Sequence, residues 1–300
     1  MIDLRNRVGI VTGAGNGLGR AYALDLAARG VKVIVNNRRH ATDAPGETSA
    51  EKTVRAIEAA GGVAAPNFDD VLDRASGERM VAQALSLWGR LDILVNNAGV
   101  DQHSSFSKIA LEEFHRIFDI NFYGSVYPTH AVYRHMREAG YGRIILSTSS
   151  AGLHALHGLT AYSAAKAALI GLTRALAAEG GIRGVFVNGI APYATTKMTV
   201  EHSSPEMVAT MKPELVAPMV AYLVSSQTRV NGQVIVAGKG AFRRGAMTEG
   251  RGYAYTEAAA ITPERIDQDL ERILDMKDAR EFPDGLVSFT DLFQSTPGAR

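Results

Sequence analysis

A tyrosine and a lysine stand four residues apart in Tyr162-Ser-Ala-Ala-Lys166. On a helix, side chains with this spacing lie on one face. A lysine cation held beside a phenol favours its ionised form, which would lower the pKa of Tyr162 from about 10 toward neutrality. A phenol with such a pKa exchanges a proton readily near neutral pH, so we expect Tyr162 to act as a general acid or base.

The spacing alone is not selective, because Tyr193 and Lys197 repeat it. That second pair follows a proline in Ala-Pro-Tyr-Ala-Thr-Thr-Lys, which we predict to be a loop. Tyr162 instead opens the Ala- and Leu-rich stretch Ala161–Glu179, where apolar residues recur at helical spacing and a Gly-Gly pair follows. Only the first pair is therefore predicted to share a helix face.

Strand-like and helical segments alternate along most of the chain. We predict strands at Val8–Thr12, Val31–Asn36, Val63–Phe68, Leu91–Asn96, Arg143–Ser147, Val185–Ile190 and Gln233–Ala237. We predict helices at Leu18–Ala28, Ser49–Ala60, Asp73–Trp88, Leu111–Glu138, Ala161–Glu179 and Val216–Ser225. Seven apolar strands separated by helices indicate an α/β fold, a Rossmann-like doubly wound parallel sheet with helices on both faces.

Residues 1–245 are predicted to form this domain, and residues 246–300 a C-terminal helical extension. In the extension, Thr262 is placed to cap a helix whose first turn holds Pro263. Its apolar stripe consists of Ile266, Leu270, Ile273 and Leu274. Such a stripe needs a covering surface, so we expect the extension to pack on its own or a partner subunit, or to cover the substrate cleft.

Composition excludes several classes of function. The 300 residues are 46% hydrophobic, enough to bury one large core, and a net charge of +1 disfavours a nucleic-acid partner. Cysteine is absent and the histidines lack metal-binding spacing, so we predict no disulfide and no metal site. No secretory signal and no apolar run of membrane length are recognisable, so we expect a cytoplasmic protein without a membrane partner.

The first predicted strand runs into Thr12-Gly-Ala-Gly-Asn-Gly-Leu-Gly19 and then directly into a helix. Small residues at such a turn let main-chain N–H groups and the positive end of the helix approach a pyrophosphate. The glycine spacing is Thr-Gly-x-x-x-Gly-x-Gly rather than Gly-x-Gly-x-x-Gly. A dinucleotide is the predicted ligand.

These motifs occur together with Asn96-Asn-Ala-Gly99, Asn121 and Ser149, in an order and spacing that resemble the short-chain dehydrogenase/reductase family. The resemblance covers residues 5 to 240. It implies that Tyr162 exchanges a proton with the substrate oxygen while a nicotinamide exchanges hydride. It also implies that Ser149 hydrogen-bonds the same oxygen, with Ser147, Thr148 and Ser150 as alternatives.

Lys166 would, by the same resemblance, support Tyr162 and bind the nicotinamide ribose, and Asn121 would hold a water that links Lys166 to solvent. The implied cofactor contacts are Gly13, Gly15, Asn16, Gly17, Leu18, Gly19, Asn37, Arg38, Arg39, Asp69, Asp70, Asn97, Ala98, Gly99, Tyr162, Lys166, Pro192 and Thr196. Of the two neighbouring acids, Asp69 matches the family's adenine contact, with Asp70 as the alternative. Tyr193 stands where the family has a glycine after Pro192, which leaves the path of that loop open.

The end of the second predicted strand decides between NAD and NADP. An acidic residue there would accept hydrogen bonds from the ribose 2′-hydroxyl and repel a 2′-phosphate. This chain has Asn37, Arg38 and Arg39 instead. Arginine pairs well with phosphate, so we predict a preference for NADP(H), with NAD(H) possible.

Further details resemble the (3R)-hydroxyacyl-CoA dehydrogenase part of peroxisomal multifunctional β-oxidation enzymes and their bacterial single-domain relatives. The resemblance lies in the connection after the second strand, in Met211-Lys-Pro-Glu-Leu-Val-Ala-Pro218 and in the tail around Thr262-Pro263-Glu264. It implies a 3-hydroxyacyl or 3-oxoacyl thioester, or a steroid, as substrate. Alternatives are an NADPH-dependent reductase of other ketones and a non-catalytic nucleotide-binding member. Family members pair their long helices, so a homodimer or homotetramer is expected.

The predicted substrate side follows strand carboxyl ends, where ligands bind in such sheets. Its apolar residues are Leu153, Leu156, Leu159, Tyr193 and Met198, and Gln102, His154 and His157 would orient a polar substrate group. Substrate, stereochemistry and direction stay open at this point.

Overall fold

A twisted sheet forms the centre of the computed structural model, which describes residues 2–40, 43–44, 47–196, 199–200, 203–257, 259 and 261–294. Its eight strands run in the order β3-β2-β1-β4-β5-β6-β7-β8. They span Val8–Val11 (β1), Lys32–Asn36 (β2), Val63–Asn67 (β3), Ile93–Asn96 (β4), Gly142–Ser147 (β5), Val185–Tyr193 (β6), Val234–Gly238 (β7) and Ala241–Gly245 (β8). Strand order reverses between β1 and β4, which in a doubly wound sheet is where ligands bind.

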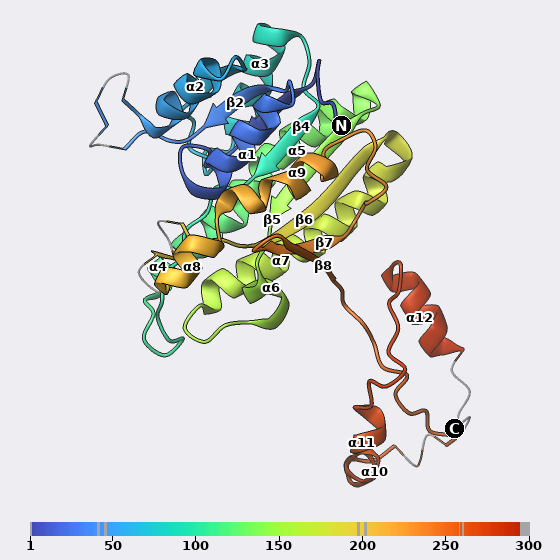
Figure 1. Ribbon diagram of the computed structural model, residues 1–300. Coiled ribbons are helices and arrows are strands. Elements are labelled where there is room, and N and C mark those ends of the chain that lie inside the picture. Colours follow the sequence, from blue (N-terminus) through green and yellow to red (C-terminus); the bar gives the residue numbers. More distant parts are fainter. Residues whose placement is uncertain are drawn as a thin grey trace. The chain divides into compact units, whose positions relative to one another are not determined.

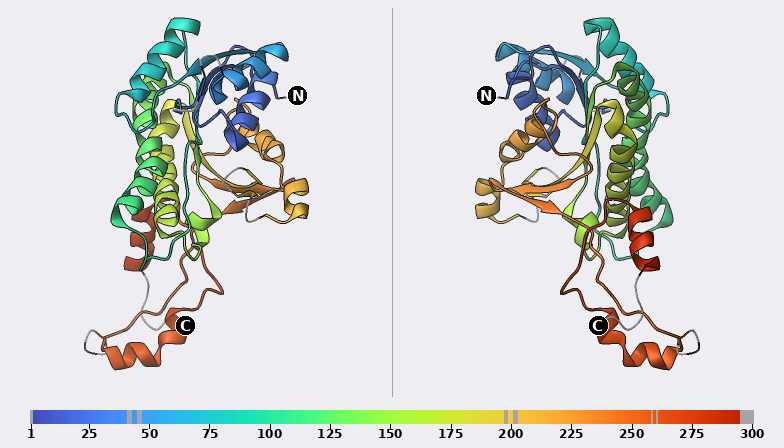
Figure 2. Two further views of the ribbon diagram at one scale, coloured as in Figure 1. Left: turned by 90° about the vertical axis from the view of Figure 1, so that its left-hand side faces the viewer. Right: turned by 90° about the vertical axis from the view of Figure 1, so that its right-hand side faces the viewer.

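Helices cover both faces of the sheet (Figures 1 and 2). One face carries α1 (Gly17–Ala28), α2 (Ser49–Ala59) and α9 (Ala217–Leu223), and the other carries α3 (Ser76–Trp88), α5 (Tyr123–Ala139) and α7 (Thr160–Gly180). Shorter elements are α4 (Leu111–Asn121), α6 (Ser150–His154), η1 (Gly181–Arg183), α8 (Pro205–Thr210) and η3 (Pro213–Leu215).

Successive side chains of a strand point to opposite faces of the sheet, so the apolar side chains are divided between two cores. In β1, Val11 joins the cluster under α1, α2 and α9, whereas its neighbour Ile10 joins the cluster under α3, α5 and α7. In β5, Ile145 and Ile144 divide in the same way. Burial on both faces explains why these strands read as continuous apolar runs in the sequence.

All seven predicted strands are present and parallel, and the Rossmann-like fold is confirmed. An eighth strand was not predicted: β8 pairs antiparallel with β7 through a tight turn at Lys239-Gly240. Strand β6 also continues to Tyr193, because it pairs with β7 as far as Gly238. The loop predicted at Tyr193 is therefore wrong, while Lys197 and Met198 lie outside the described residues.

The predicted helix Leu111–Glu138 is two helices, α4 and α5, separated at Phe122. Asn121 ends α4, and its side-chain Nδ2 donates to the main-chain oxygen of Ile117 at 2.8 Å. Pro128, inside α5, cannot donate a main-chain hydrogen bond. The break places the Asn121 side chain toward the carboxyl ends of the strands.

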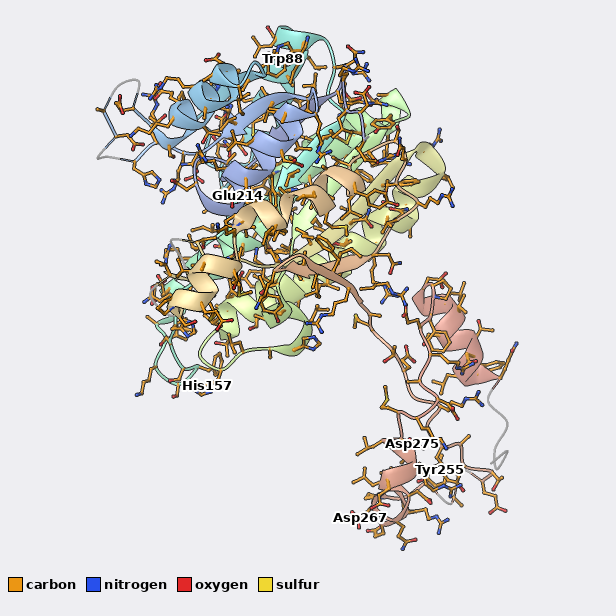
Figure 3. All side chains as sticks on the ribbon, in the orientation of Figure 1. Trp88, His157, Glu214, Tyr255, Asp267 and Asp275 are labelled. Carbon is orange, nitrogen blue, oxygen red and sulfur yellow. The ribbon has the colours of Figure 1, made fainter. Side chains whose placement is uncertain are left out.

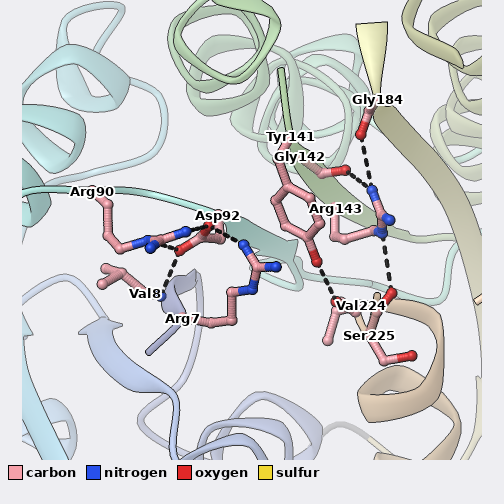
Figure 4. A network of polar contacts seen from close by, with 10 residues as sticks. All are labelled: Arg7, Val8, Arg90, Asp92, Tyr141, Gly142, Arg143, Gly184, Val224 and Ser225. Carbon is pink, nitrogen blue, oxygen red and sulfur yellow. Dashed lines mark hydrogen bonds and ion pairs between the residues drawn. The ribbon is translucent and has the colours of Figure 1, made fainter. Parts of the chain in front are cut away.

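Charged residues fix the amino-terminal edge of the sheet, opposite the predicted site (Figure 4). Buried Asp92 accepts hydrogen bonds from Arg7 at 2.8 Å, from Arg90 at 2.6 Å and from the main-chain N–H of Val8 at 2.9 Å. These donors outweigh the cost of burial and hold the pKa of Asp92 below its usual value. The carboxylate thereby links the segment before β1 to the segment before β4.

Arg143 in β5 is buried beside this network (Figure 4). Its guanidinium lies 4.4 Å from the ring centres of both Tyr141 and Phe186, and Arg7 covers Tyr141 at 3.8 Å. The guanidinium donates to the main-chain oxygens of Gly142, Gly184 and Ser225. One side chain thus joins β5, the segment before β6 and the segment after α9.

The chain divides into two compact units, Met1–Gly245 and Ala246–Arg300. The second contains α10 (Pro263–Gln268), α11 (Leu270–Ile273) and α12 (Gly285–Phe293). In this unit Asp269 is 5% exposed, and its carboxylate pairs with Arg265 at 2.9 Å and with Arg272 at 3.2 Å. Arg272 also lies 3.8 Å from the ring centre of Tyr253.

The predicted cap of this extension is confirmed, because the Thr262 side chain accepts a hydrogen bond from the N–H of Arg265 at 3.2 Å. The single predicted helix is wrong: it ends at Gln268, and Asp269 separates it from α11. Ile266 and Leu274 stay 39% and 65% exposed.

Within the described ranges, none of the helices combines the length and apolar character needed to cross a bilayer.

Candidate active site

Tyr162 and Lys166 lie in the first two turns of α7, as their spacing predicts. The Lys166 Nζ atom is 5.4 Å from the centre of the Tyr162 ring and donates to the main-chain oxygen of Ser147 at 2.7 Å. Lys166 is buried and Tyr162 is half-buried. The hydrogen bond to β5 holds the ammonium at the carboxyl ends of the strands.

Burial dominates the protonation of both groups. It raises the pKa of Tyr162 to about 12, although a hydrogen bond with Ser149 opposes the rise. It lowers the pKa of Lys166 to about 8, and the carboxylate of Asp101 opposes that fall. The predicted lowering of the Tyr162 pKa is therefore wrong, because withdrawing the phenolate from water costs more than a lysine at this distance returns. At neutral pH Tyr162 carries its proton.

Ser149 is the serine that the structure brings to Tyr162. It follows β5 and precedes α6, where its Oγ atom accepts from the N–H of Ala151 at 3.1 Å. The alternatives point elsewhere or lie in another element: Thr148 donates to Ile190 of β6 at 3.0 Å, and Ser150 lies within α6. The Ser149 side chain lies near enough to the Tyr162 hydroxyl to oppose the rise of its pKa.

Asn121 connects α4 to the loop after β4. Its Nδ2 atom donates to the main-chain oxygen of Val100 at 2.6 Å as well as to Ile117. Its Oδ1 atom is buried and has no partner among the described residues. A Cβ atom at Gly99 would lie 2.6 Å from this oxygen and 3.6 Å from the Lys166 Nζ atom. The free acceptor thus faces the region of the lysine.

The glycine turn is held tightly against the loop after β4. The Thr12 side-chain oxygen accepts from the N–H groups of Asn97 and Ala98 at 3.0 and 3.1 Å. Gly13 has a φ of +63°, and a Cβ there would lie 2.9 Å from the Cα atom of Ala98. A Cβ at Gly19 would lie 2.4 Å from the main-chain oxygen of Gly13. The N-terminus of α1 has no side-chain cap, which leaves its N–H groups available to a phosphate.

Two clefts connect these groups. The central cleft, of 230 Å³, is lined by Gly13, Asn16, Gly17, Leu18, Asn37, Asn97, Ala98, Gly99, Asn121, Ser147, Thr148, Tyr162, Lys166, Pro192 and Thr196. The lateral cleft, of 400 Å³, shares Gly13, Asn37, Ala98 and Gly99 and adds Asn36, Arg38, His40, Asp69, Asp70, Val71, Leu72, Val100, Arg116 and Ile120. Most of the predicted cofactor contacts therefore lie on two adjoining clefts that meet at the glycine turn.

Three predicted contacts are placed differently. Gly15 lies behind the turn, where a Cβ would be 2.2 Å from the Ser49 side-chain oxygen, and Gly19 supports Gly13 from within α1. The Arg39 guanidinium covers the ring of Phe68 at 4.1 Å and is not part of either cleft lining. Arg38 does line the lateral cleft.

Asp69 and Asp70 both line the lateral cleft, but their carboxylates are engaged locally. Asp69 accepts from Arg79 at 2.6 Å and from the Asn67 amide at 2.9 Å. Asp70 accepts from the N–H of Leu72 at 2.9 Å. The carboxylate of Asp69 thus fixes the segment after β3.

Sequence reasoning missed several residues of the site. His40, Arg116 and Ile120 line the lateral cleft without a motif that marks them. Asp101 was also missed, although its place two residues after Gly99 could have identified it. On the predicted substrate side, Gln102, His154 and His157 are exposed, and His157 projects from the turn between α6 and α7 (Figure 3).

The glycine turn at the N-terminus of α1 adjoins two clefts, and Tyr162, Lys166 and Asn121 line the central one, features that a dinucleotide-dependent dehydrogenase requires. Residues 7–207 match the family model described as short chain dehydrogenase, and the chain belongs to this family. Members of the family use NAD(P)(H).

Several similar proteins align with most of the length of this chain. Peroxisomal multifunctional enzyme A of Dictyostelium discoideum is 36% identical over 91% of this chain, which spans 61% of that protein. A 3-oxoacyl-[acyl-carrier-protein] reductase of Synechocystis is 35% identical over 79% of this chain and 100% of its own length. The solved structure of full-length peroxisomal multifunctional enzyme type 2 from Drosophila melanogaster superposes with a TM-score of 0.81, at 30% identity, over 97% of this chain and 49% of that one.

Proposed function

We propose that the protein is an NADP(H)-dependent oxidoreductase that interconverts a hydrophobic ketone and its secondary alcohol, with a 3-oxoacyl thioester as the favoured ketone. The observation that carries this proposal is the placement of Tyr162, buried Lys166 and Asn121 together on the central cleft, with Ser149 near enough to Tyr162 to lower its pKa. The free Oδ1 atom of Asn121 and the close approach of Gly13 to Ala98 fit a dinucleotide laid along the clefts. The nicotinamide would supply or accept the hydride at the carbonyl carbon.

The chain's own residues would handle the proton. In reduction, Tyr162 gives its proton to the carbonyl oxygen as negative charge develops there, and Ser149 donates a hydrogen bond to the same oxygen. Lys166, held by Ser147, supplies positive charge that stabilises the phenolate left behind. Because burial keeps Tyr162 protonated at neutral pH, the site is prepared to donate a proton, which favours the reductive direction.

The preference for NADP(H) rests on Arg38. It lines the lateral cleft next to Asn37, at the end of β2 where a 2′-phosphate would approach. A guanidinium there offers charge-assisted hydrogen bonds, and no acidic residue stands at the end of β2 to repel the phosphate. Arg39 contributes less because it covers Phe68.

Three activity assays would test the function. NADPH oxidation should be followed with acetoacetyl-CoA, a 17-keto steroid and simple aryl ketones, each also with NADH. We expect turnover with NADPH and the highest kcat/KM for the thioester. Turnover of the steroid or aryl ketones alone would contradict the thioester assignment, and absence of turnover with every ketone would contradict the proposal as a whole.

Replacing Arg38 tests the cofactor assignment. R38Q should lower kcat/KM for NADPH by about 10- to 100-fold while changing the value for NADH little, since only the phosphate contact is lost. R39Q should have the smaller effect of the two. Equal losses for both cofactors in R38Q would contradict a specific phosphate contact.

A further inference from the structure

One face of α4 forms part of the lateral cleft. Arg116 and Ile120 both line this cleft, and because they stand four residues apart on one helix they share a face. The loop after β4 is attached to the same helix, since Asn121 donates to the main-chain oxygen of Val100 at 2.6 Å, and Val100 lines the cleft as well. This part of the lining therefore combines two apolar side chains with one arginine.

The rest of the lateral cleft suits the adenosine half of a dinucleotide. Gly13 and Ala98 line both clefts, so a pyrophosphate at the glycine turn would leave the central cleft to the nicotinamide and the lateral cleft to the adenosine. Val71 and Leu72 add further apolar lining there. A purine has two flat faces, which bind best to apolar or planar groups.

Glu113 holds the guanidinium of Arg116 at two points. The Nε atom of Arg116 donates to Glu113 Oε2 at 2.7 Å, and its Nη2 atom donates to Oε1 at 2.6 Å. These hydrogen bonds lower the pKa of Glu113 and raise that of Arg116, so both groups stay charged. The pair fixes the plane of the guanidinium and compensates its charge.

Arg38 lines the same cleft but is placed differently. Among the described residues, no carboxylate pairs with its guanidinium. A phosphate needs positive charge that is not already compensated, and Arg38 supplies it. Arg116 offers instead a flat and fixed guanidinium face, the kind of surface on which nucleobases stack.

We propose that Arg116 binds the adenine base of the cofactor: its guanidinium, held in place by Glu113, stacks on the ring at the rim of the lateral cleft. Arg38 pairs with the 2′-phosphate. This inference rests on the proposed dinucleotide-dependent function and adds a residue that sets the affinity for NADPH and NADH without choosing between them.

Binding without a ketone present tests the inference directly. Dissociation constants of NADPH and NADH are measured by fluorescence titration, and that of ADP-ribose by calorimetry. R116M should raise all three by the same factor, about 3- to 30-fold, because the stacking face is lost. R116K keeps the charge without the plane and should lose about as much. R38Q, by contrast, should weaken only NADPH.

Arg134 provides the matched control. It lies on α5, pairs with Glu138 at 3.3 Å and lines neither cleft. R134Q also removes a helix-surface ion pair, so it should leave the three dissociation constants unchanged.

Kinetics with a cofactor that lacks the base separate stacking from a structural role. In R116M the KM for NADPH should rise while kcat at saturating NADPH stays, because the base is remote from the hydride. Reduced nicotinamide mononucleotide has no adenine, so its kcat/KM should be equal in R116M and the unaltered protein.

Each other result contradicts the inference. Weaker binding of NADPH but not of NADH in R116M would make Arg116 a phosphate ligand, and full affinity in R116K would show that charge rather than the plane acts. Equal losses with NADPH and the mononucleotide would indicate a structural role, and unchanged affinity in R116M would indicate none. If ADP-ribose binding depends on Arg116 but the unaltered protein reduces none of the ketones, the inference stands and the proposed oxidoreductase function is contradicted.

Discussion

Replacing Asn121 with alanine removes the hydrogen bonds that connect α4 to the loop after β4. The side chain is fully buried and donates two hydrogen bonds, at 2.6 Å to Val100 and at 2.8 Å to Ile117. Losing them leaves two main-chain oxygens without their donor, at a cost of about 1–2 kcal/mol each. N121A should therefore lose about 2–4 kcal/mol of unfolding free energy, measured by urea denaturation.

The same change should disturb catalysis, because the loop that Asn121 fixes continues to Asp101 and lies beside Lys166. A displacement of about 1 Å in such a group is enough to lower kcat by tenfold or more. Asn188 provides a matched control. It is 1% exposed in β6, donates to Val230 at 2.8 Å and accepts from Gln233 at 3.1 Å, and it lines neither cleft.

N188A should lose a similar amount of stability and keep its kcat at temperatures where it is folded. If N121A and N188A lose activity in parallel with stability, or if N121A keeps full kcat, Asn121 has no special part in the site and the reasoning is wrong.

Three further predictions follow from single contacts. K166M should abolish turnover yet stabilise the protein by about 1–3 kcal/mol at pH 7, because burial lowers the folded pKa of Lys166 to about 8. Denaturation at several pH values should show that this gain in unfolding free energy shrinks as pH rises from 8 toward 10.5. G99A should lower kcat/KM at least about tenfold, since the new Cβ atom would lie 2.6 Å from the Asn121 Oδ1 atom. The Asn121 side chain cannot move away because its amide donates two hydrogen bonds, so unchanged kinetics would contradict the placement of that oxygen. D92N should cost about 2–3 kcal/mol in urea denaturation with kcat preserved, because it breaks the two ion pairs of buried Asp92, which are remote from the site. It should also flatten the loss of stability below pH 4, since the folded pKa of Asp92 is lowered.

The sheet could be predicted from the sequence because strands buried on both faces give continuous apolar runs, as in Val8–Val11 and Gly142–Ser147. The eighth strand could not, because β8 is an exposed edge strand, Ala-Phe-Arg-Arg-Gly, whose pairing with β7 is set by the turn before it. The break between α4 and α5 lies beside Asn121, whose side chain bonds to the main chain of Val100 in the loop after β4. Helical periodicity does not report such a bond.

At the site, the sequence predicted that Tyr162 and Lys166 share a helix face, but not their protonation. Spacing placed Tyr162 and Lys166 on one face, and the structure agrees. The direction of the Tyr162 pKa was predicted wrongly, because burial, which depends on the whole fold, outweighs the neighbouring charge. The effect of Asp101 on the pKa of Lys166 could not be predicted either, because it depends on how the loop after β4 lies relative to α7.

The most direct test of the central claim is the kcat of Y162F, measured with NADPH and the best ketone, together with the NADPH dissociation constant from fluorescence titration. Phenylalanine fills the same space without the proton. We expect kcat to fall by about 100-fold or more while the dissociation constant changes by less than about threefold. A Y162F protein that binds NADPH normally and keeps its kcat would contradict the assignment of Tyr162 as the proton donor.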